Sequence, residues 1–275
     1  MSIRRAAVAG SWYPGSAPAL RAAVDTCFAA VDGRAPEDLG RVAALVAPHA
    51  GIRYSGRIAA AAYRLLRADA YDVAVLVGPS HFMAFEGAAV YAAGGFETPF
   101  GVVAVDEACA RELLSVPVVR ELPAPHRREH SLELQLPFLQ RAAPGLPIVP
   151  LLMGVQTAAA ARQLAEALAA VLAGRRALLV ASTDLSHYHD AATACRLDRV
   201  IVDAVGRFDA EALEEALARN PGHACGGGPL LAVLRASRLL GASRASVLAY
   251  GDSGDVTGDK TAVVGYMAAA IGDGP

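Results

Sequence analysis

The chain has 275 residues, of which 54% are hydrophobic and 19% are charged, and its formal net charge is −2 at pH 7. This composition predicts a sizeable core and argues against intrinsic disorder. A near-neutral charge without a basic stripe argues against nucleic-acid binding. We find no apolar run of about 18 residues, no signal peptide and no disulfide framework, so we expect a cytoplasmic protein without a membrane partner.

Short apolar segments alternate with helical patterns along the chain. This alternation predicts an α/β fold, with helices on both faces of a mixed central sheet and a single domain spanning residues 1–275. In the first part of the chain, we predict a helix at 17–31, a strand at 42–47, a helix at 55–66, and strands at 73–77 and 88–91. Helices at 106–114 and 131–141 follow, the second with a kink at Pro137, and then a strand at 148–152, a helix at 158–172 and a strand at 177–181. The last part has helices at 192–205, 210–218 and 228–240, and strands at 246–250 and 261–269.

Three of the predicted strands run into a turn that carries a histidine. The first leads to His49, the second to His81, and the third to Asp184 and His187. In an open α/β sheet, ligands bind in the crevice outside the carboxyl ends of the strands. Because imidazole is the commonest metal ligand among side chains, this pattern indicates a shared site that binds a metal.

Other polar residues near these turns are candidates for catalysis or substrate binding. Asp184 precedes His187 by three residues, and a carboxylate can orient an imidazole that acts as a general acid or base. Asp184 could instead cap the following turn. His130 and Glu133 would share one helix face and could hold a metal or a polar substrate group. Ordinary helix-start chemistry is the alternative for that pair.

Two residues in glycine-rich segments complete the set of candidates. Cys225 lies just before a predicted helix, whose N-terminus should lower the thiol pKa and favour a thiolate, a soft ligand for iron, copper or zinc. The other three cysteines fall in helical patterns and are expected to be small core residues. Lys260, the only lysine, closes a loop of glycines and aspartates. Its ammonium could attract an anionic substrate or neutralise nearby carboxylates, and Asp255 of the same loop is a further candidate for substrate binding. The alternative is a surface ion pair between Lys260 and Asp255 or Asp259.

The motifs taken together resemble the Memo family, whose bacterial members are called AmmeMemoRadiSam system protein B. The resemblance implies a fold similar to the class III extradiol dioxygenases of the LigB type, which hold non-haem iron with two histidines and one carboxylate. It covers the whole chain in order, through residues 4–14, 48–56, 78–82, 129–139, 182–188, 225–226 and 251–265.

The resemblance also implies roles for individual residues. The family's metal ligands fall here on His49, His81 and Cys225, so that a thiolate stands where the dioxygenases have a carboxylate. This departure argues against ring-cleaving dioxygenation and makes copper plausible beside iron. The adjacent pocket residues of the family fall on Asp184, His187 and His130. The resemblance therefore implies a metal-dependent redox protein.

Two other functions fit the same residues. A dioxygenase-like cleft could bind a peptide or a small molecule without turnover. A His-His-Cys set with one water is also a catalytic zinc site, as found in hydrolases. The family name further implies a functional association with radical-SAM and AMMECR1-like proteins.

Overall fold

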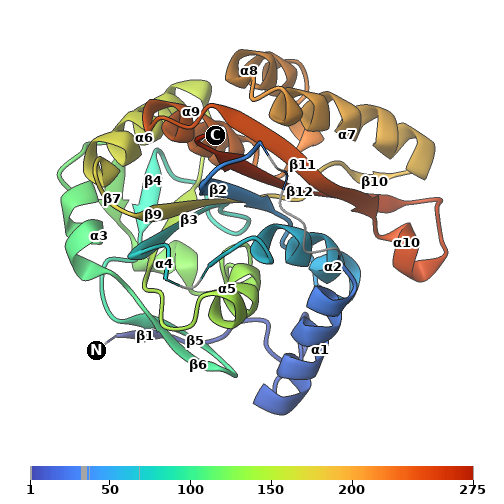
Figure 1. Cartoon of the computed structure of the whole chain (residues 1–275), viewed down its shortest axis with the longest axis horizontal. Helices are drawn as coiled ribbons and strands as arrows, with labels where there is room; N and C mark the ends of the chain where they lie inside the picture. Colours follow the sequence, from blue (N-terminus) through green and yellow to red (C-terminus); the bar gives the residue numbers. More distant parts are fainter. Residues whose placement is uncertain (1, 32–35, 37, 68, 275) are drawn as a thin grey trace.

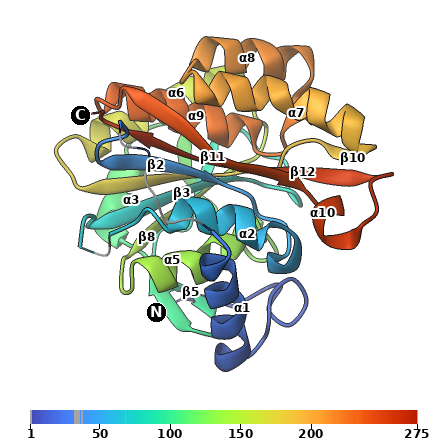
Figure 2. The same cartoon turned by 45° about the vertical axis from the view of Figure 1, so that its right-hand side comes forward.

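A mixed β-sheet divides the molecule into two helical layers (Figures 1 and 2). The computed structural model describes residues 2–31, 36, 38–67 and 69–274. Within these residues the main sheet has nine strands: β2 (Val42–Ala47), β3 (Val73–Pro79), β4 (Ala88–Val90), β7 (Val119–Glu121), β8 (Ile148–Met153), β9 (Ala177–Ser182), β10 (His187–His189), β11 (Arg244–Asp252) and β12 (Val263–Gly272). Their order is β10-β12-β2-β9-β3-β8-β4-β7, and β11 pairs with β12.

The centre of the sheet is parallel, and the strand on either side of this centre runs antiparallel to it. β2, β9, β3 and β8 run in the same direction, whereas β12 and β4 run against their neighbours β2 and β8. The central strands are continuous apolar segments because both of their faces are buried. Because these four strands run in the same direction, their carboxyl ends lie at one edge of the sheet. The combination of parallel and antiparallel pairs confirms the predicted mixed sheet.

Helices cover both faces of this sheet. On one side lie α6 (Ala158–Leu172), α7 (Ala191–Gly206), α8 (Ala210–Arg219) and α9 (Gly227–Leu239), and on the other lie α1 (Ala17–Ala29), α2 (Ile52–Tyr63) and α5 (Leu136–Ala142) (Figures 1 and 2). α9 packs between the sheet and α6, so ten of its 13 residues are buried. A helix that is apolar around most of its circumference fits this central position.

Smaller elements complete the fold. The helical ones are α3 (Glu107–Leu113), α4 (Pro123–His126), α10 (Gly254–Thr257) and the 3₁₀ turns η1 (Glu133–Gln135) and η2 (Pro221–His223). β1 (Ile3–Arg4), β5 (Gly95–Thr98) and β6 (Gly101–Ala104) form a separate three-stranded sheet. These three strands were not predicted, because two to four residues are too few to show an alternating pattern.

The segment around Pro137 differs from the prediction of one kinked helix. Residues 133–135 form the 3₁₀ turn η1, and α5 starts only at Leu136. Pro137 therefore lies in the first turn of α5. A proline at that position leaves no hydrogen bond unmade, since its missing N–H has no partner within the helix.

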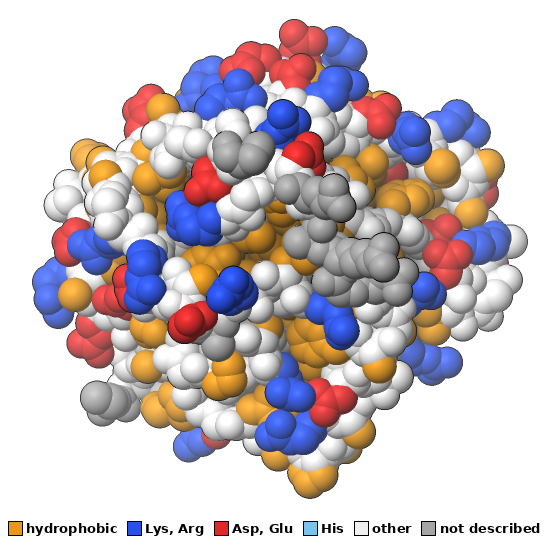
Figure 3. Space-filling view, viewed as in Figure 1, with side chains coloured by type: hydrophobic (Ala, Val, Ile, Leu, Met, Phe, Trp, Pro, Cys, Tyr) orange, Lys and Arg blue, Asp and Glu red, His pale blue; other side chains and the backbone are white. Residues whose placement is uncertain are grey.

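Charged side chains on the surface are mixed in sign. Basic and acidic groups are interspersed over the face shown in Figure 3. Some of them join neighbouring helices: Arg162 of α6 and Arg235 of α9 both pair with Glu214 of α8, at 3.0 and 2.9 Å. Across the described ranges, no helix is both long enough and apolar enough to cross a membrane.

Candidate metal centre

The parallel strands bring three predicted site residues to one edge of the sheet. His49 follows β2, His81 follows β3, and Asp184 follows β9. The pairing of Ala47 with Ser182 places the ends of β2 and β9 at the same level. Cys225 comes from the segment before α9, which packs across β2, β3 and β9.

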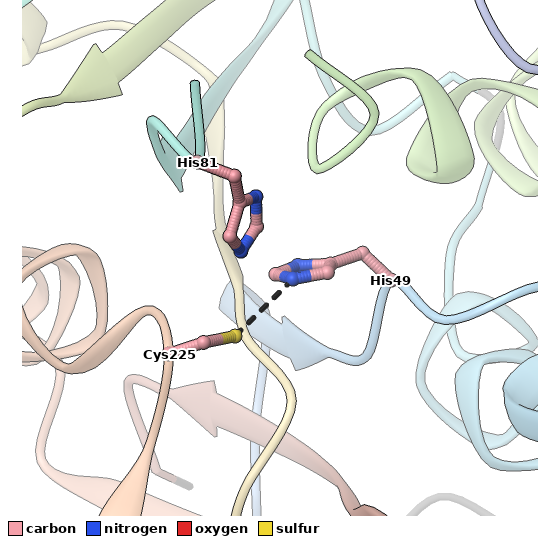
Figure 4. Close-up of side chains that lie close together, drawn as sticks. All are labelled: His49, His81 and Cys225. Atoms are coloured by element: carbon pink, nitrogen blue, oxygen red, sulfur yellow. Dashed lines mark hydrogen bonds between the residues drawn. The ribbon is translucent and has the colours of Figure 1, made fainter. Parts of the chain in front are cut away.

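The side chains of His49, His81 and Cys225 point toward one another (Figure 4). One potential ligand atom of each lies within 4.8 Å of the other two. Cys225 Sγ is 3.2 Å from His49 Nε2, and the two imidazole centroids are 5.3 Å apart. Ligands at about 2.0–2.3 Å from a shared metal are themselves separated by about 3–4 Å. The predicted convergence is confirmed, and the donor set fits a metal that accepts nitrogen and sulfur ligands.

His81 is oriented by a buried carboxylate that we did not single out from the sequence. Glu129 Oε1 lies 2.9 Å from His81 Nδ1, and Oε2 accepts a 2.6 Å hydrogen bond from the His81 backbone. Burial acts to raise the pKa of Glu129, but the hydrogen bonds and charge of His81 outweigh it and lower this pKa to about 2. Because a carboxylate only accepts, His81 Nδ1 keeps its hydrogen, and in the neutral ring Nε2 is free to act as a metal ligand.

A second group of potential ligands consists of His81, Glu129 and His130, whose ligand atoms also lie within 4.8 Å of one another. Glu129 Oε1, however, also accepts hydrogen bonds from the backbone amides of His130 and Ser131, both at 2.9 Å. Its oxygens are therefore already engaged by donors. We regard this group as support for His81 rather than as a second metal site.

His49 is almost completely buried, with 1% of its surface exposed. Burial, reinforced by the positive charge of His81, lowers the pKa of His49 to about 3, so the ring is neutral at pH 7. Asp184 Oδ1 accepts hydrogen bonds from the backbone amides of His49 and Ala50, at 2.7 and 3.3 Å. Asp184 thus fixes the turn that carries His49, and burial raises its own pKa.

The expected pairing of Asp184 with His187 is not observed. His187 Nδ1 instead lies 2.8 Å from the carbonyl oxygen of Leu185. His187 is half-buried, and its charge is close enough to affect the pKa values of both His49 and Asp184.

His130 is also close to the cluster. Its ring stacks on His81 with 4.6 Å between centroids and packs against Trp12 at 4.3 Å. Burial lowers the pKa of His130 to about 4. His130 does not share a helix face with Glu133 as predicted, because it lies ahead of η1.

The thiol of Cys225 does not have the lowered pKa that we predicted from its position before a helix. Burial, and then the charge of Asp184, raise this pKa instead. The first amides of α9 are already used: Gly227 N donates to Ala224 O, and Gly228 N donates to Gln156 Oε1. The predicted core position of Cys195 is also wrong, since Cys195 is exposed.

The turn around Cys225 is held by specific contacts. Gln156 Nε2 donates to the Cys225 carbonyl at 2.8 Å, and Gly226 N donates to Thr183 Oγ1 at 2.9 Å. A Cβ atom on Gly226 would lie only 2.4 Å from Ser182 O. Glycine is therefore required here, because it lets the segment with Cys225 approach the end of β9.

Glu133 is not available to a substrate, contrary to our prediction. It is fully buried and pairs with Arg4. Its oxygens also accept hydrogen bonds from Tyr13 Oη at 2.6 Å and from the backbone amide of Ala7 at 2.8 Å. Glu133 fastens the N-terminal segment to the core, which is a structural role.

Lys260 and Asp255 form a surface ion-pair cluster rather than a lining of the cleft. Lys260 Nζ lies 2.8 Å from Asp252 and 2.6 Å from Asp255, and the lysine side chain is 45% exposed. The alternative of a surface ion pair is therefore the one found. Asp252 is a partner that we did not predict.

An aromatic cavity of about 600 Å³ opens beside the cluster. Ala50, the residue directly after His49, lines this cavity, and its walls include Trp12, Tyr54, Tyr188 and Tyr266. Tyr188 has a φ of 63°, a left-handed backbone conformation that is unusual for a tyrosine. Strain of this kind concentrates at functional sites, and here it holds an exposed aromatic ring at the cavity.

Comparison with known proteins identifies the family. Residues 4–270 match the family described as Memo-like protein. A MEMO1 family protein of Methanosarcina mazei is 39% identical to the chain, and the match covers 98% of this chain and 100% of that protein. A MEMO1 family protein of Aquifex aeolicus is 34% identical, and the match covers 97% of this chain and 98% of that protein. A crystal structure of the uncharacterized Escherichia coli K12 protein JW3007 aligns with a TM-score of 0.55 at 17% identity, covering 82% of this chain and 99% of that one, which shows a shared fold. The chain belongs to the Memo-like protein family.

Proposed function

We propose that this protein is a metal-dependent redox protein in which His49, His81 and Cys225 hold iron or copper. The observation that carries the proposal is the convergence of one potential ligand atom from each of the three residues within 4.8 Å. Two imidazoles and one thiolate form a donor set that redox-active transition metals accept, and that copper electron-transfer sites use. The metal, when bound, would supply the one-electron chemistry that the side chains of this cluster lack.

The protein's own residues prepare and surround this set. Glu129 fixes His81, and Asp184 fixes the turn of His49. Cys225 must release its proton before it can act as a ligand, so metal binding should be weaker at low pH. His187 does not belong to the three-residue group, but its charge acts on the pKa of His49, and we assign to it the transfer of protons at the cleft.

The test is a metal analysis of protein purified without a histidine tag. We expect about one iron or copper per chain in the wild type, and its loss in His49→Ala. His187→Ala is the matched control, because it removes a neighbouring imidazole that we place outside the ligand set. Loss of the metal in His187→Ala would contradict this division of roles. Zinc in place of iron or copper would favour a hydrolase, since the same donor set serves catalytic zinc.

The aromatic cavity favours a second candidate function, the binding of a peptide or a small molecule without turnover. Trp12 is the only tryptophan of the chain, and it both lines the cavity and packs against His130. Its fluorescence therefore reports ligands of the cavity directly. Ligand-dependent quenching in a protein that retains no metal would support this second function. The association with radical-SAM and AMMECR1-like proteins stays a prediction.

A further inference from the structure

A chain of buried side chains stands behind His49. Tyr63 ends α2, Gln135 belongs to η1, and Ser182 ends β9; all three are fully buried. Tyr63 Oη lies 2.9 Å from Gln135 Oε1, Gln135 Nε2 lies 2.8 Å from Ser182 Oγ, and Ser182 Oγ lies 2.9 Å from His49 Nδ1. We call Tyr63, Gln135 and Ser182 the relay.

Two backbone carbonyls determine the direction of every hydrogen bond in the relay. Pro48 O lies 3.0 Å from the Gln135 amide nitrogen. A carbonyl only accepts, so the amide nitrogen faces Pro48 and gives its second hydrogen to Ser182. Ser131 O lies 2.7 Å from Ser182 Oγ and takes the single hydroxyl hydrogen. Ser182 can then only accept from His49, so His49 Nδ1 must be the donor.

We propose that Ser182, oriented by Gln135, is a positioning residue that locks His49 as its Nδ1–H tautomer. The lone pair of Nε2 is then always directed toward Cys225 Sγ, 3.2 Å away. Hydrogen bonds of this kind set the tautomer and the orientation of metal-binding histidines. Only the consequence for metal binding rests on the proposed function, because the tautomer belongs to the protein without metal.

His49 and His81 reach the same orientation by different means. His81 donates to the charged carboxylate of Glu129, and its side chain is 29% exposed. His49 donates to the neutral hydroxyl of Ser182 in a site closed to water. The relay is therefore the device that orients a ligand without adding a charge to the interior.

The first experiment needs no substitution in the relay. In metal-free wild-type protein labelled with ¹⁵N-histidine, long-range ¹H–¹⁵N spectra distinguish the two neutral tautomers. The signals of His49 are assigned by their absence in His49→Gln. We expect the Nδ1–H pattern for His49 at neutral pH. An Nε2–H pattern would overturn the proposal, and this result does not depend on whether any relay variant folds.

The second experiment compares two buried serines that undergo the same substitution. Ser182→Ala removes the acceptor of His49 Nδ1–H, so we expect a mixture of tautomers and a 10- to 100-fold weaker affinity for Zn²⁺, used as a redox-silent probe. Ser131→Ala keeps the backbone carbonyl that accepts from Ser182 and removes only the Ser131 hydroxyl, which is equally buried but donates to Pro79 O at 2.9 Å. It should leave both properties unchanged, and Ser182→Thr should restore them.

The outcomes separate this proposal from the proposed function. The expected tautomer in a wild type that binds no Zn²⁺ would leave the relay standing and overturn the metal site. A Ser182→Ala protein that keeps the wild-type tautomer and affinity would overturn the relay alone. Equal losses in Ser131→Ala and Ser182→Ala would also overturn it, because the effect would then come from any buried hydroxyl near the site.

Discussion

The candidate metal site formed by His49, His81 and Cys225, called the corner below, and the loop closed by Lys260 looked alike in the sequence but differ in the structure. Both place polar residues in turns beside strands. In the corner, His49 is buried and has a protein partner on each ring nitrogen. In the loop, the Lys260 side chain is 45% exposed and pairs with two aspartates. The comparison shows that a reactive residue type in a turn becomes a site only where burial and directed hydrogen bonds fix it.

The largest expected difference between the two regions is in metal affinity. Cys225→Ala removes one of the three proposed ligands, so we expect its Zn²⁺ affinity to fall by more than the factor of about 100 that the loss of a supporting residue can cause. Lys260→Ala should bind Zn²⁺ like the wild type. Competition titration against a chromophoric chelator measures both proteins. Equal affinities for Cys225→Ala and the wild type would show that Cys225 is not a metal ligand.

Acid stability is the second contrast. Burial lowers the pKa values of His49 and His126 to about 3 and that of His130 to about 4. Between these values and about 6.5 the unfolded chain binds more protons than the folded one. The free energy of unfolding should therefore fall as the pH drops from about 6.5 toward 4, by about 1.4 kcal/mol per pH unit for each histidine.

The loop closed by Lys260 should contribute no pH dependence to the free energy of unfolding over the same interval. The ion pair with Lys260 lowers the pKa of Asp255 from 3.8, so its contribution to stability is lost only below that pH. Urea unfolding of metal-free protein between pH 7 and 4 measures the slope. His126 lies outside the three-residue group, and His126→Phe replaces its imidazole by an aromatic ring that cannot bind a proton. This variant should reduce the slope by the contribution of one histidine, about 1.4 kcal/mol per pH unit. An unchanged slope would show that His126 is not a buried neutral base.

A smaller effect is expected from the carboxylate behind His81. Glu129→Gln removes the charge and replaces one of the two acceptor oxygens by an NH₂ donor, so His81 is held less firmly and we expect a 10- to 100-fold loss of Zn²⁺ affinity. Glu133→Gln is the matched control, since Glu133 is also buried but contacts Arg4 and Tyr13. It should lower the melting temperature without changing the Zn²⁺ affinity of the folded protein. The reverse pattern would exchange the roles of the two glutamates.

The sequence was sufficient to predict where the corner lies. The apolar strands and the histidines after them fixed the edge at which His49 and His81 meet, because strand direction in an α/β sheet follows from the alternation of elements. The resemblance added Cys225 as the third ligand. Local patterns suffice for such inferences, since each depends on residues that are neighbours in the chain.

The supporting residues could not be predicted in the same way. Glu129 is 48 residues from His81, and Ser182 is 133 residues from His49. A glutamate before a helix and a serine at a strand end have many uses, and only the folded chain shows their partners. The predicted lowering of the Cys225 thiol pKa was wrong for a related reason. The helix N-terminus can be predicted from the sequence, whereas the burial that raises the pKa of the thiol cannot.

The smallest expected effect is in the loop itself. Lys260→Ala removes an ammonium that lies within 3 Å of Asp252 and Asp255. Both the lysine and Asp255 face solvent, so water and salt screen the pair, and we expect stability to change by about 1 kcal/mol or less. Lys260→Arg should be closer still to the wild type, because it keeps the charge. Thermal unfolding at low and high salt measures the difference, which should shrink as salt is added. A loss of several kcal/mol, or one that persists at high salt, would mean that the loop is held as firmly as the corner.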